Sequence, residues 1–217
     1  MNNAPGRSPT RRNDPDLTRD RPVEPATTAL LIVDVQNGTF NEAQQAIRPE
    51  FFAAARDVVI PNLQRLVAAS RRAGVEVIYT VIENLTRDGR DRSLDYKLTG
   101  FSFGKGSWEA KVLDAIAPGE DEIVIPKTSS SLFNSTNADY LLRNIGITDL
   151  VVTGFLTDQC IDHTVKDGAD RGYYVTCLTD ACMANTHARH AEALAMFAGY
   201  CRQMTSAAWL AMAEAAG

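Results

Sequence analysis

The sequence predicts a three-layer α/β/α domain with a central, mostly parallel sheet. The main observation is that apolar runs typical of buried strands alternate with helical patterns about five times along the chain. Strands joined through helices pair in parallel by right-handed crossovers, which places helices on both faces of the sheet. A chain of 217 residues that is 45% hydrophobic is also long enough to bury one sizeable core.

The first three elements form a strand, helix and strand unit. Residues 28–35 (TALLIVDV) are almost continuously apolar, as expected of a strand that is covered on both faces. Residues 49–73 carry apolar side chains at helical spacing and end at Gly74, a residue typical of the position after a helix. The run VEVIYTV over 75–81 predicts the second strand.

The middle of the chain repeats the alternation with shorter elements. We expect a short helix over 106–116, which Pro118 closes, and a strand over 122–125. A helix over 137–144 and a strand over 149–153 (DLVVT) follow. These segments predict two further strands of the same sheet.

The last third of the chain contains the remaining strand and helix signals. A helix is expected over 157–171, ending before Gly172, and a strand over 173–178. The final expected elements are a helix over 189–200, a short strand or turn over 203–206 and a helix over 207–216.

Composition limits the domain organisation and the partners. Residues 1–25 are rich in proline and polar residues and cannot bury enough apolar area to offset their ordering entropy, so we expect a flexible arm before a domain over 26–217. The arm lacks the apolar segment of a secretory signal, and no apolar run approaches the roughly 20 residues that span a bilayer. We therefore expect a cytoplasmic protein. The net charge of −5 disfavours a nucleic-acid partner and favours a small-molecule substrate.

Three residues near strand ends are candidates for chemistry. Asp34 interrupts an apolar strand, and a buried carboxylate is energetically costly unless it is paired. Asp34 is therefore either functional or caps the following turn. Lys127 directly follows the run IVIP and either points into the crevice or is a solvated surface lysine. Cys160 lies in the first turn of a helix, where N–H groups and the helix dipole favour a thiolate and can donate to an oxyanion. The alternative for Cys160 is an inert buried thiol.

The other cysteines and the histidines fit less active roles. Three cysteines lie in apolar contexts typical of buried thiols, and the histidines are interpreted as structural or peripheral. Because no histidine precedes Cys160, an Asp and His metal cluster near Asp34 cannot form, and we expect no metal and no other cofactor. The three cysteines are Cys177, Cys182 and Cys201, and the three histidines are His163, His187 and His190.

Three separated motifs, LLIVDVQNGTF, EIVIPKTSSSLFNST and LVVTGFLTDQC, together resemble the isochorismatase-like cysteine hydrolase superfamily. The resemblance covers about residues 27–209 and implies an isochorismatase-like, Rossmann-like fold that commonly forms homo-oligomers, either dimers or tetramers. It implies a catalytic triad in which Asp34 is the general base, Lys127 balances charge and lowers the thiol pKa, and Cys160 is the nucleophile. It also implies a cis peptide at Phe155–Leu156 and an oxyanion hole formed by the backbone N–H groups of Leu156 and Cys160.

Within the superfamily, the segment GKGSWEAKVLDAIAPGEDEIVIPK resembles ureidoacrylate-type amidohydrolases. This implies attack of a thiolate on a small linear amide, ureido or carbamoyl compound, with a thioester intermediate and release of ammonia or an amine. Nicotinamidases fit less well, because they carry an Asp and two His for a metal in an interval that has no histidine here. Two alternatives stay open, namely isochorismatase-type ether hydrolysis and a non-catalytic binding protein of the same fold.

Loops beyond the strands supply candidates for substrate binding. Glu83 follows the second strand and either binds a ureido NH₂ group or is a solvated loop carboxylate. The loop containing Arg87, Arg90 and Arg92 either covers the site and holds a substrate carboxylate or is an exposed charged loop. The expected substrate-binding residues are Gln36, Asn37, Phe40, Glu83, Asn84, Tyr96, Phe133 and Gln159.

Overall fold

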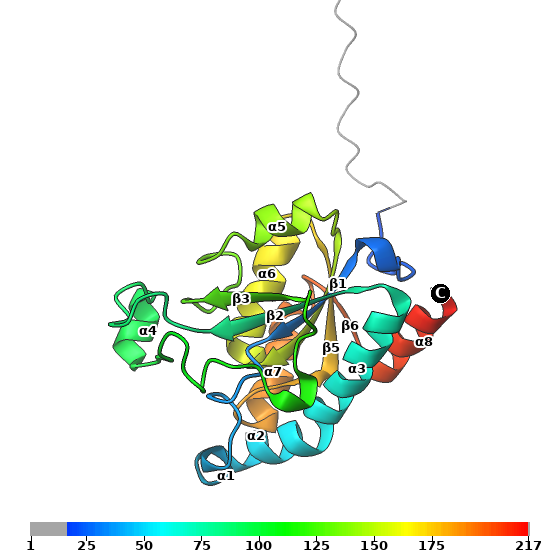
Figure 1. Cartoon of the computed structure of the whole chain (residues 1–217). Helices are drawn as coiled ribbons and strands as arrows, with labels where there is room; N and C mark the ends of the chain where they lie inside the picture. The colour runs from blue at the N-terminus through cyan, green and yellow to red at the C-terminus, as the bar shows by residue number, and fades with distance from the viewer. Residues whose placement is uncertain (1–16, 217) are drawn as a thin grey trace, which may run out of the picture.

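The central sheet consists of parallel strands in the order β3-β2-β1-β4-β5-β6 (Figure 1). The computed structural model describes residues 17–216, and the three-layer α/β/α prediction is confirmed there. The six strands in this range are β1 (Thr28–Val33), β2 (Glu76–Ile82), β3 (Ile123–Lys127), β4 (Asp149–Phe155), β5 (Tyr174–Met183) and β6 (Arg202–Met204).

Helices cover both faces of the sheet. One apolar cluster joins the sheet to α2, α3 and α8, and a second joins it to α5, α6 and α7 (Figure 1). None of the helices in the described range is long and apolar enough to cross a bilayer. Their bounds are α1 (Ala43–Ile47), α2 (Pro49–Ala54), α3 (Ile60–Ala73), α4 (Leu94–Thr99), α5 (Ala138–Asn144), α6 (Asp162–Asp170), α7 (His187–Phe197) and α8 (Ser206–Ala216).

Burial of β1 explains its continuous apolar run. All six of its residues are buried. Successive side chains of a strand point to opposite faces, so Leu30 and Ile32 join the cluster under α3, whereas Leu31 and Val33 join the cluster under α6. A strand in the middle of a parallel sheet therefore has no face on which a polar side chain would meet water.

The expected helix over 106–116 is wrong. Only its last residues are helical, and they form the short 3₁₀ helix η3 (Asp114–Ile116). The rest of the segment lies along the loop after β1, where the Asn37 N–H donates to Lys111 O and the Leu113 N–H donates to Val35 O. Hydrogen bonds to a distant loop thus override the local helical pattern.

The expected helix over 49–73 is continuous but not uniform. Between α2 and α3 lies a π-helical turn, η2 (Ala55–Val59), which ends shortly before Pro61. Proline lacks an N–H donor and disturbs the regular hydrogen bonds of the preceding helical turn. π-Helical turns occur mostly as single-turn bulges inside α-helices. Gly74 ends α3 with a φ of 73°, as the sequence predicts.

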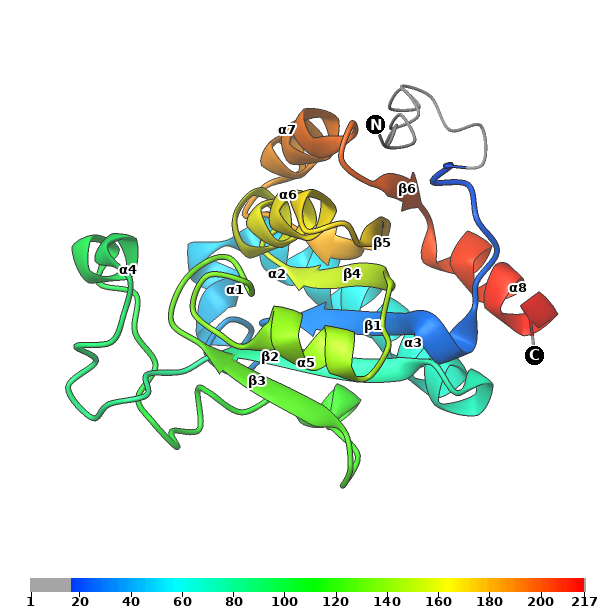
Figure 2. The same cartoon turned by 90° about the horizontal axis from the view of Figure 1, so that it is seen from above.

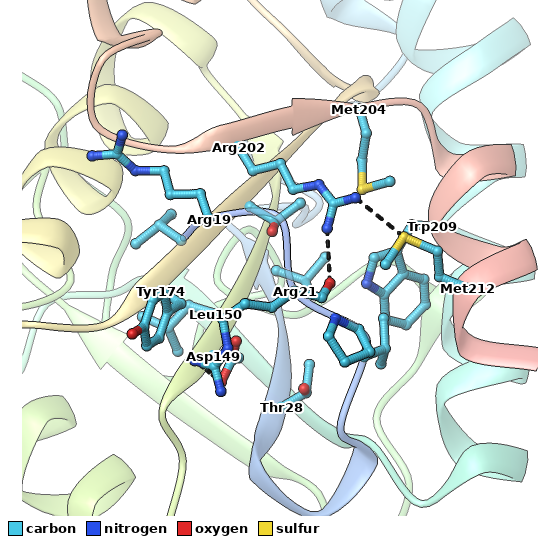
Figure 3. A pocket seen from close by; sticks show the side chains of 15 residues that line it. Arg19, Arg21, Thr28, Asp149, Leu150, Tyr174, Arg202, Met204, Trp209 and Met212 are labelled. Carbon is cyan, nitrogen blue, oxygen red and sulfur yellow. Dashed lines mark hydrogen bonds and ion pairs between the residues drawn. The ribbon is translucent and has the colours of Figure 1, made fainter. Parts of the chain in front are cut away.

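The packed domain begins earlier than residue 26. Residues 1–16 of the expected arm lie outside the described residues. Arg21 pairs with Asp149 at 3.6 Å and lies 3.9 Å from the centre of the Tyr174 ring, while Val23 is buried in the cluster under α3. Figure 3 shows Arg21 among side chains that surround a small pocket beside β4, β5 and α8. The arm is therefore anchored to the domain from Arg21 onward.

Candidate active site

The three candidate catalytic residues meet beyond the carboxyl ends of the strands. Asp34 directly follows β1, and Lys127 is the last residue of β3. Cys160 lies in the π-helical turn η4 (Thr157–Ile161), which follows β4. The sequence order of the strands reverses between β1 and β4, and ligands of open α/β sheets bind at such a switch point.

The neighbouring strands fix the Asp34 carboxylate. Asp34 has a φ of 57°, a left-handed conformation that costs a residue other than glycine roughly 1–2 kcal/mol. Beside it, Gly154 approaches β1 so closely that a Cβ at this position would lie 2.1 Å from Val33 O. Thr80 Oγ1 donates a hydrogen bond of 2.8 Å to Asp34 Oδ1, and Asp34 is only 1% exposed.

The turn that carries Cys160 begins at Leu156, whose peptide bond with Phe155 is cis. The Cys160 thiol is buried. A hydrogen bond of 2.8 Å between Thr157 Oγ1 and His190 Nδ1 attaches the start of the turn to α7. π-Helical turns are frequent at functional sites.

The Lys127 ammonium joins the other two side chains. Lys127 Nζ lies 2.8 Å from Asp34 Oδ2 and 3.3 Å from Cys160 Sγ, and it donates to Ser129 O at 2.9 Å. Lys127 is fully buried, so the alternative of a solvated surface lysine is wrong. A buried ammonium requires such partners, because an uncompensated charge in the interior is highly unfavourable.

The charges of the site follow from burial and from this ion pair. Burial raises the pKa of the Cys160 thiol to about 12, and the Lys127 ammonium opposes this rise without cancelling it. The Lys127 ammonium therefore lowers the pKa of the thiol, as the resemblance implies, but burial outweighs it and the net change is upward. Burial is the largest single influence on the pKa of Lys127 and lowers it, but Asp34, Cys160 and Tyr96 together raise it by more, so the net change is upward. The site therefore combines a charged pair with a neutral thiol.

Tyr96 completes the surroundings of the thiol. Its hydroxyl lies 3.5 Å from Lys127 Nζ and 3.7 Å from Cys160 Sγ. It is held in α4, where Ser93 Oγ accepts a hydrogen bond from the Tyr96 N–H. Burial raises the pKa of Tyr96, so the phenol stays neutral and acts as a hydrogen-bonding group.

A cavity of about 1040 Å³ opens beside Asp34 and Cys160 and has room for a small molecule. Of the expected substrate-binding residues, Tyr96 and Gln159 line it. Phe101 lines it from the segment that carries α4, which Figure 2 shows standing away from the sheet at the end of two long loops.

Three of the expected polar residues connect loops and lie outside the cavity lining. Gln36 bonds to the backbone of Ile82 through both ends of its amide, at 3.0 and 2.6 Å. Glu83 Oε1 accepts the Gly106 N–H, and Asn84 Nδ2 donates to a serine hydroxyl in the same loop. These side chains hold the long α4 segment against the end of β2.

The remaining three expected residues also lie outside the lining. Asn37 Nδ2 donates to a backbone oxygen in the segment before η3. Phe40 stacks on Phe52, with ring centres 5.0 Å apart, and Phe133 stacks on Tyr173 at 5.8 Å. Both phenylalanines are packed between elements of the fold.

The sequence reasoning missed several polar residues that line the cavity. Asp158 pairs with Arg189, and its Oδ1 atom is buried without a hydrogen-bond partner among the described residues. Asp158 belongs to the TDQC motif that also contains Cys160, and this could have indicated that Asp158 lines the site. Arg48 and Asn185 also line the cavity, but each is an isolated polar residue without a local pattern.

The histidines do not form a metal site. His163 lines the cavity, His190 bonds to the η4 turn as described above, and His187 begins α7. Among residues 17–216, no group of three or more His, Cys, Asp or Glu side chains is arranged to hold a metal ion.

Comparison with known proteins identifies the family. The isochorismatase domain matches residues 28–208. The chain belongs to the isochorismatase family. It is 33% identical over 175 residues to ureidoacrylate amidohydrolase RutB of Pantoea ananatis, covering 72% of this chain and 69% of that protein. Over 190 residues it is 32% identical to RutB of Methylobacterium radiotolerans, covering 80% and 74%. This isochorismatase-family chain is therefore a hydrolase.

Solved structures of the family share the fold. A cysteine hydrolase from Pseudomonas syringae pv. phaseolicola superposes with a TM-score of 0.80 at 27% identity, covering 91% of this chain and 97% of that one. N-carbamoylsarcosine amidase from Thermoplasma acidophilum gives a TM-score of 0.66 at 25% identity, with coverage of 83% and 96%. The resemblance drawn from the three motifs is thus confirmed.

Proposed function

We propose that this hydrolase cleaves a carbon–nitrogen bond in a small linear amide, ureido or carbamoyl compound through a covalent intermediate on Cys160. The observation that best supports the proposal is the Lys127 ammonium, which lies within 3.3 Å of both Cys160 Sγ and Asp34 Oδ2. Similar proteins are named for ureidoacrylate and N-carbamoylsarcosine, and both names describe a carbonyl bonded to nitrogen.

The first step is proton transfer coupled to nucleophilic attack. Asp34 takes the proton from Cys160 Sγ while the sulfur attacks the substrate carbonyl carbon. Because the pKa of the thiol is about 12, a carboxylate cannot hold its proton at equilibrium, and the transfer proceeds together with formation of the C–S bond. The Lys127 ammonium stabilises the negative charge that develops on sulfur.

The following steps return the site to its starting state. The backbone N–H groups of Leu156 and Cys160 bind the oxyanion, the C–N bond breaks, and Asp34 passes its proton to the departing nitrogen. Ammonia or an amine leaves, and the acyl or carbamoyl group remains bound to sulfur. Water then loses a proton to Asp34 and attacks the carbonyl. The C–S bond breaks, and the proton returns from Asp34 to sulfur.

An ammonia-release screen tests this proposal. The panel contains ureido acids, biuret-like compounds, nicotinamide and N-carbamoyl amino acids. The wild-type protein should release ammonia from at least one ureido or carbamoyl compound, and Cys160→Ser should lower that kcat by about 10³-fold or more. Cys201→Ser is the matched control, since Cys201 is also a buried thiol but lies outside the cavity lining. Full turnover by Cys160→Ser would overturn the proposal and favour chemistry that does not need the thiol.

A further inference from the structure

Arg48 lies at the start of α2 and lines the same cavity as Cys160. Its guanidinium carbon lies 4.2 Å from the centre of the Phe51 ring, which supports the flat face of the group. Its Nη2 atom donates to Thr39 O at 2.6 Å, and Thr39 Oγ1 donates in turn to Asp34 O at 2.7 Å. The cation is therefore fixed in the loop that also positions Asp34.

The partners of Arg48 carry no charge. Besides Thr39 O, its guanidinium donates to Gln44 Oε1 at 2.8 Å and to Asn185 Oδ1 at 3.2 Å. In the described part of the chain, no carboxylate pairs with Arg48. Burial lowers its pKa, as expected of a cation without a nearby counter-ion. A half-buried cation in this situation is stabilised by any anion that reaches it.

Arg48 and its two amide neighbours keep N–H donors that no group in the described range accepts. A guanidinium has five N–H donors, and the hydrogen bonds named above use three of them, so two remain. Gln44 and Asn185 turn their amide oxygens to Arg48, which leaves their NH₂ ends, and neither NH₂ group donates to a residue in the described range. All three side chains line the cavity.

The other charges of the cavity lining are compensated or solvated. Asp34 pairs with Lys127, and Asp158 pairs with Arg189. Asp95 is exposed on α4. Arg48 is thus the half-buried charge in this lining for which the fold supplies no partner of opposite sign.

We propose that Arg48, with the amide NH₂ groups of Gln44 and Asn185, is the specificity site that binds an anionic group of the substrate, such as a carboxylate. The inference rests on the proposed function, because the anion would be carried by the compound whose carbonyl reaches Cys160. It assigns the substrate to the acidic members of the ureido and carbamoyl class. The arginines of the 87–92 loop, the earlier candidates for this role, are not part of the lining.

The test compares two substrates of similar length, 3-ureidopropionate and n-butylurea, which differ in the negative charge at one end. The wild-type protein should have the higher kcat/KM for 3-ureidopropionate. Arg48→Gln should lower the ratio of the two kcat/KM values about 10-fold to 100-fold, mainly through the KM of the acid, as expected for loss of hydrogen bonds to a charged group. Arg48→Lys should restore part of the ratio. A purely structural role of Arg48 would lower both values together and leave the ratio unchanged, which would overturn the proposal.

Arg92→Gln is the matched control. Arg92 also donates to backbone oxygens, at 3.0 Å in each of two hydrogen bonds, but it does not line the cavity. Its replacement should leave the substrate ratio at the wild-type value. If Arg92→Gln lowers the ratio and Arg48→Gln does not, the proposal is overturned and the loop arginine binds the anion.

A binding measurement separates this proposal from the proposed function. Calorimetry with Cys160→Ser measures the Kd of 3-ureidopropionate without turnover, and the added Arg48→Gln change should raise that Kd about 10-fold to 100-fold. If no compound is hydrolysed but this shift is found, the proposed chemistry fails and the anion site stands. If Cys160→Ser does not bind 3-ureidopropionate, or binds it equally with and without Arg48, the anion site fails.

Discussion

Replacement of Lys127 by methionine should leave the Asp34 carboxylate buried and unpaired. The two side chains are 0% and 1% exposed, and they contact each other at 2.8 Å. Removal of one member of a buried ion pair costs about 3–5 kcal/mol of unfolding free energy. A domain of 150–250 residues loses roughly 2–4 °C of Tm for each kcal/mol, so Lys127→Met should lower Tm by about 6–20 °C.

A second replacement separates the charge effect from the loss of packing. In Asp34→Asn/Lys127→Met both partners are neutral, so most of the lost Tm should return, although ammonia release should stay at least about 10³-fold below wild type. Thermal unfolding followed by circular dichroism at pH 7 measures the stability of each variant, and the ammonia assay measures activity.

Lys166→Met is the control for an ordinary ion pair. Lys166 pairs with Asp162 at 2.7 Å, but its side chain is 34% exposed, so this replacement should cost less than about 1 kcal/mol. The reasoning is refuted if Lys127→Met melts within about 2 °C of wild type, a shift of at most about 1 kcal/mol. It is also refuted if the double variant is no more stable than Lys127→Met.

Three further predictions concern the same site. Gly154→Ala should lower the unfolding free energy by about 3 kcal/mol or more in urea titrations, because the added Cβ would lie 2.1 Å from Val33 O. Gly104→Ala is the control and should have little effect, because its Cβ would lie 3.8 Å from the nearest atom. Because the pKa of Cys160 is raised to about 12, its contribution to stability is complete below about pH 8.5 and is lost as the pH rises toward 12. Cys160→Ser should therefore flatten the decline in stability between pH 9 and 11 by up to about 1.4 kcal/mol per pH unit, and an unchanged slope would contradict the burial argument. Tyr96→Phe should lower kcat less than about tenfold, because the Tyr96 hydroxyl is only a neutral hydrogen-bonding neighbour of the thiol. A loss of kcat as large as that of Cys160→Ser would contradict this and indicate that the phenol transfers a proton.

The sequence singled out Asp34, Lys127 and Cys160 because each residue ends or follows a strand with a strong apolar pattern. The carboxyl ends of parallel strands lie at one edge of the sheet, which made these three residues candidates, and the resemblance to the isochorismatase-like superfamily implied that they form one site. The same logic did not apply to Arg48 and Asn185, which lie in loops and are positioned by hydrogen bonds to distant residues.

Other features depend on contacts that no local pattern contains. The segment over 106–116 has a helical pattern, but backbone groups of the loop after β1 bind it in an irregular form that contains turns. The helix α4 has only six residues, too few for a periodic signal. The direction of the Cys160 pKa shift depends on how completely the surrounding atoms cover the sulfur, which the TDQC motif does not reveal.

Mass spectrometry of the protein quenched during turnover tests the role of Cys160 most directly. With a hydrolysed ureido acid, the peptide that contains Cys160 should gain the mass of the carbamoyl or acyl group, and alkylation of this cysteine beforehand should abolish both the added mass and ammonia release. Steady ammonia release by a protein whose Cys160 is fully alkylated would contradict the account.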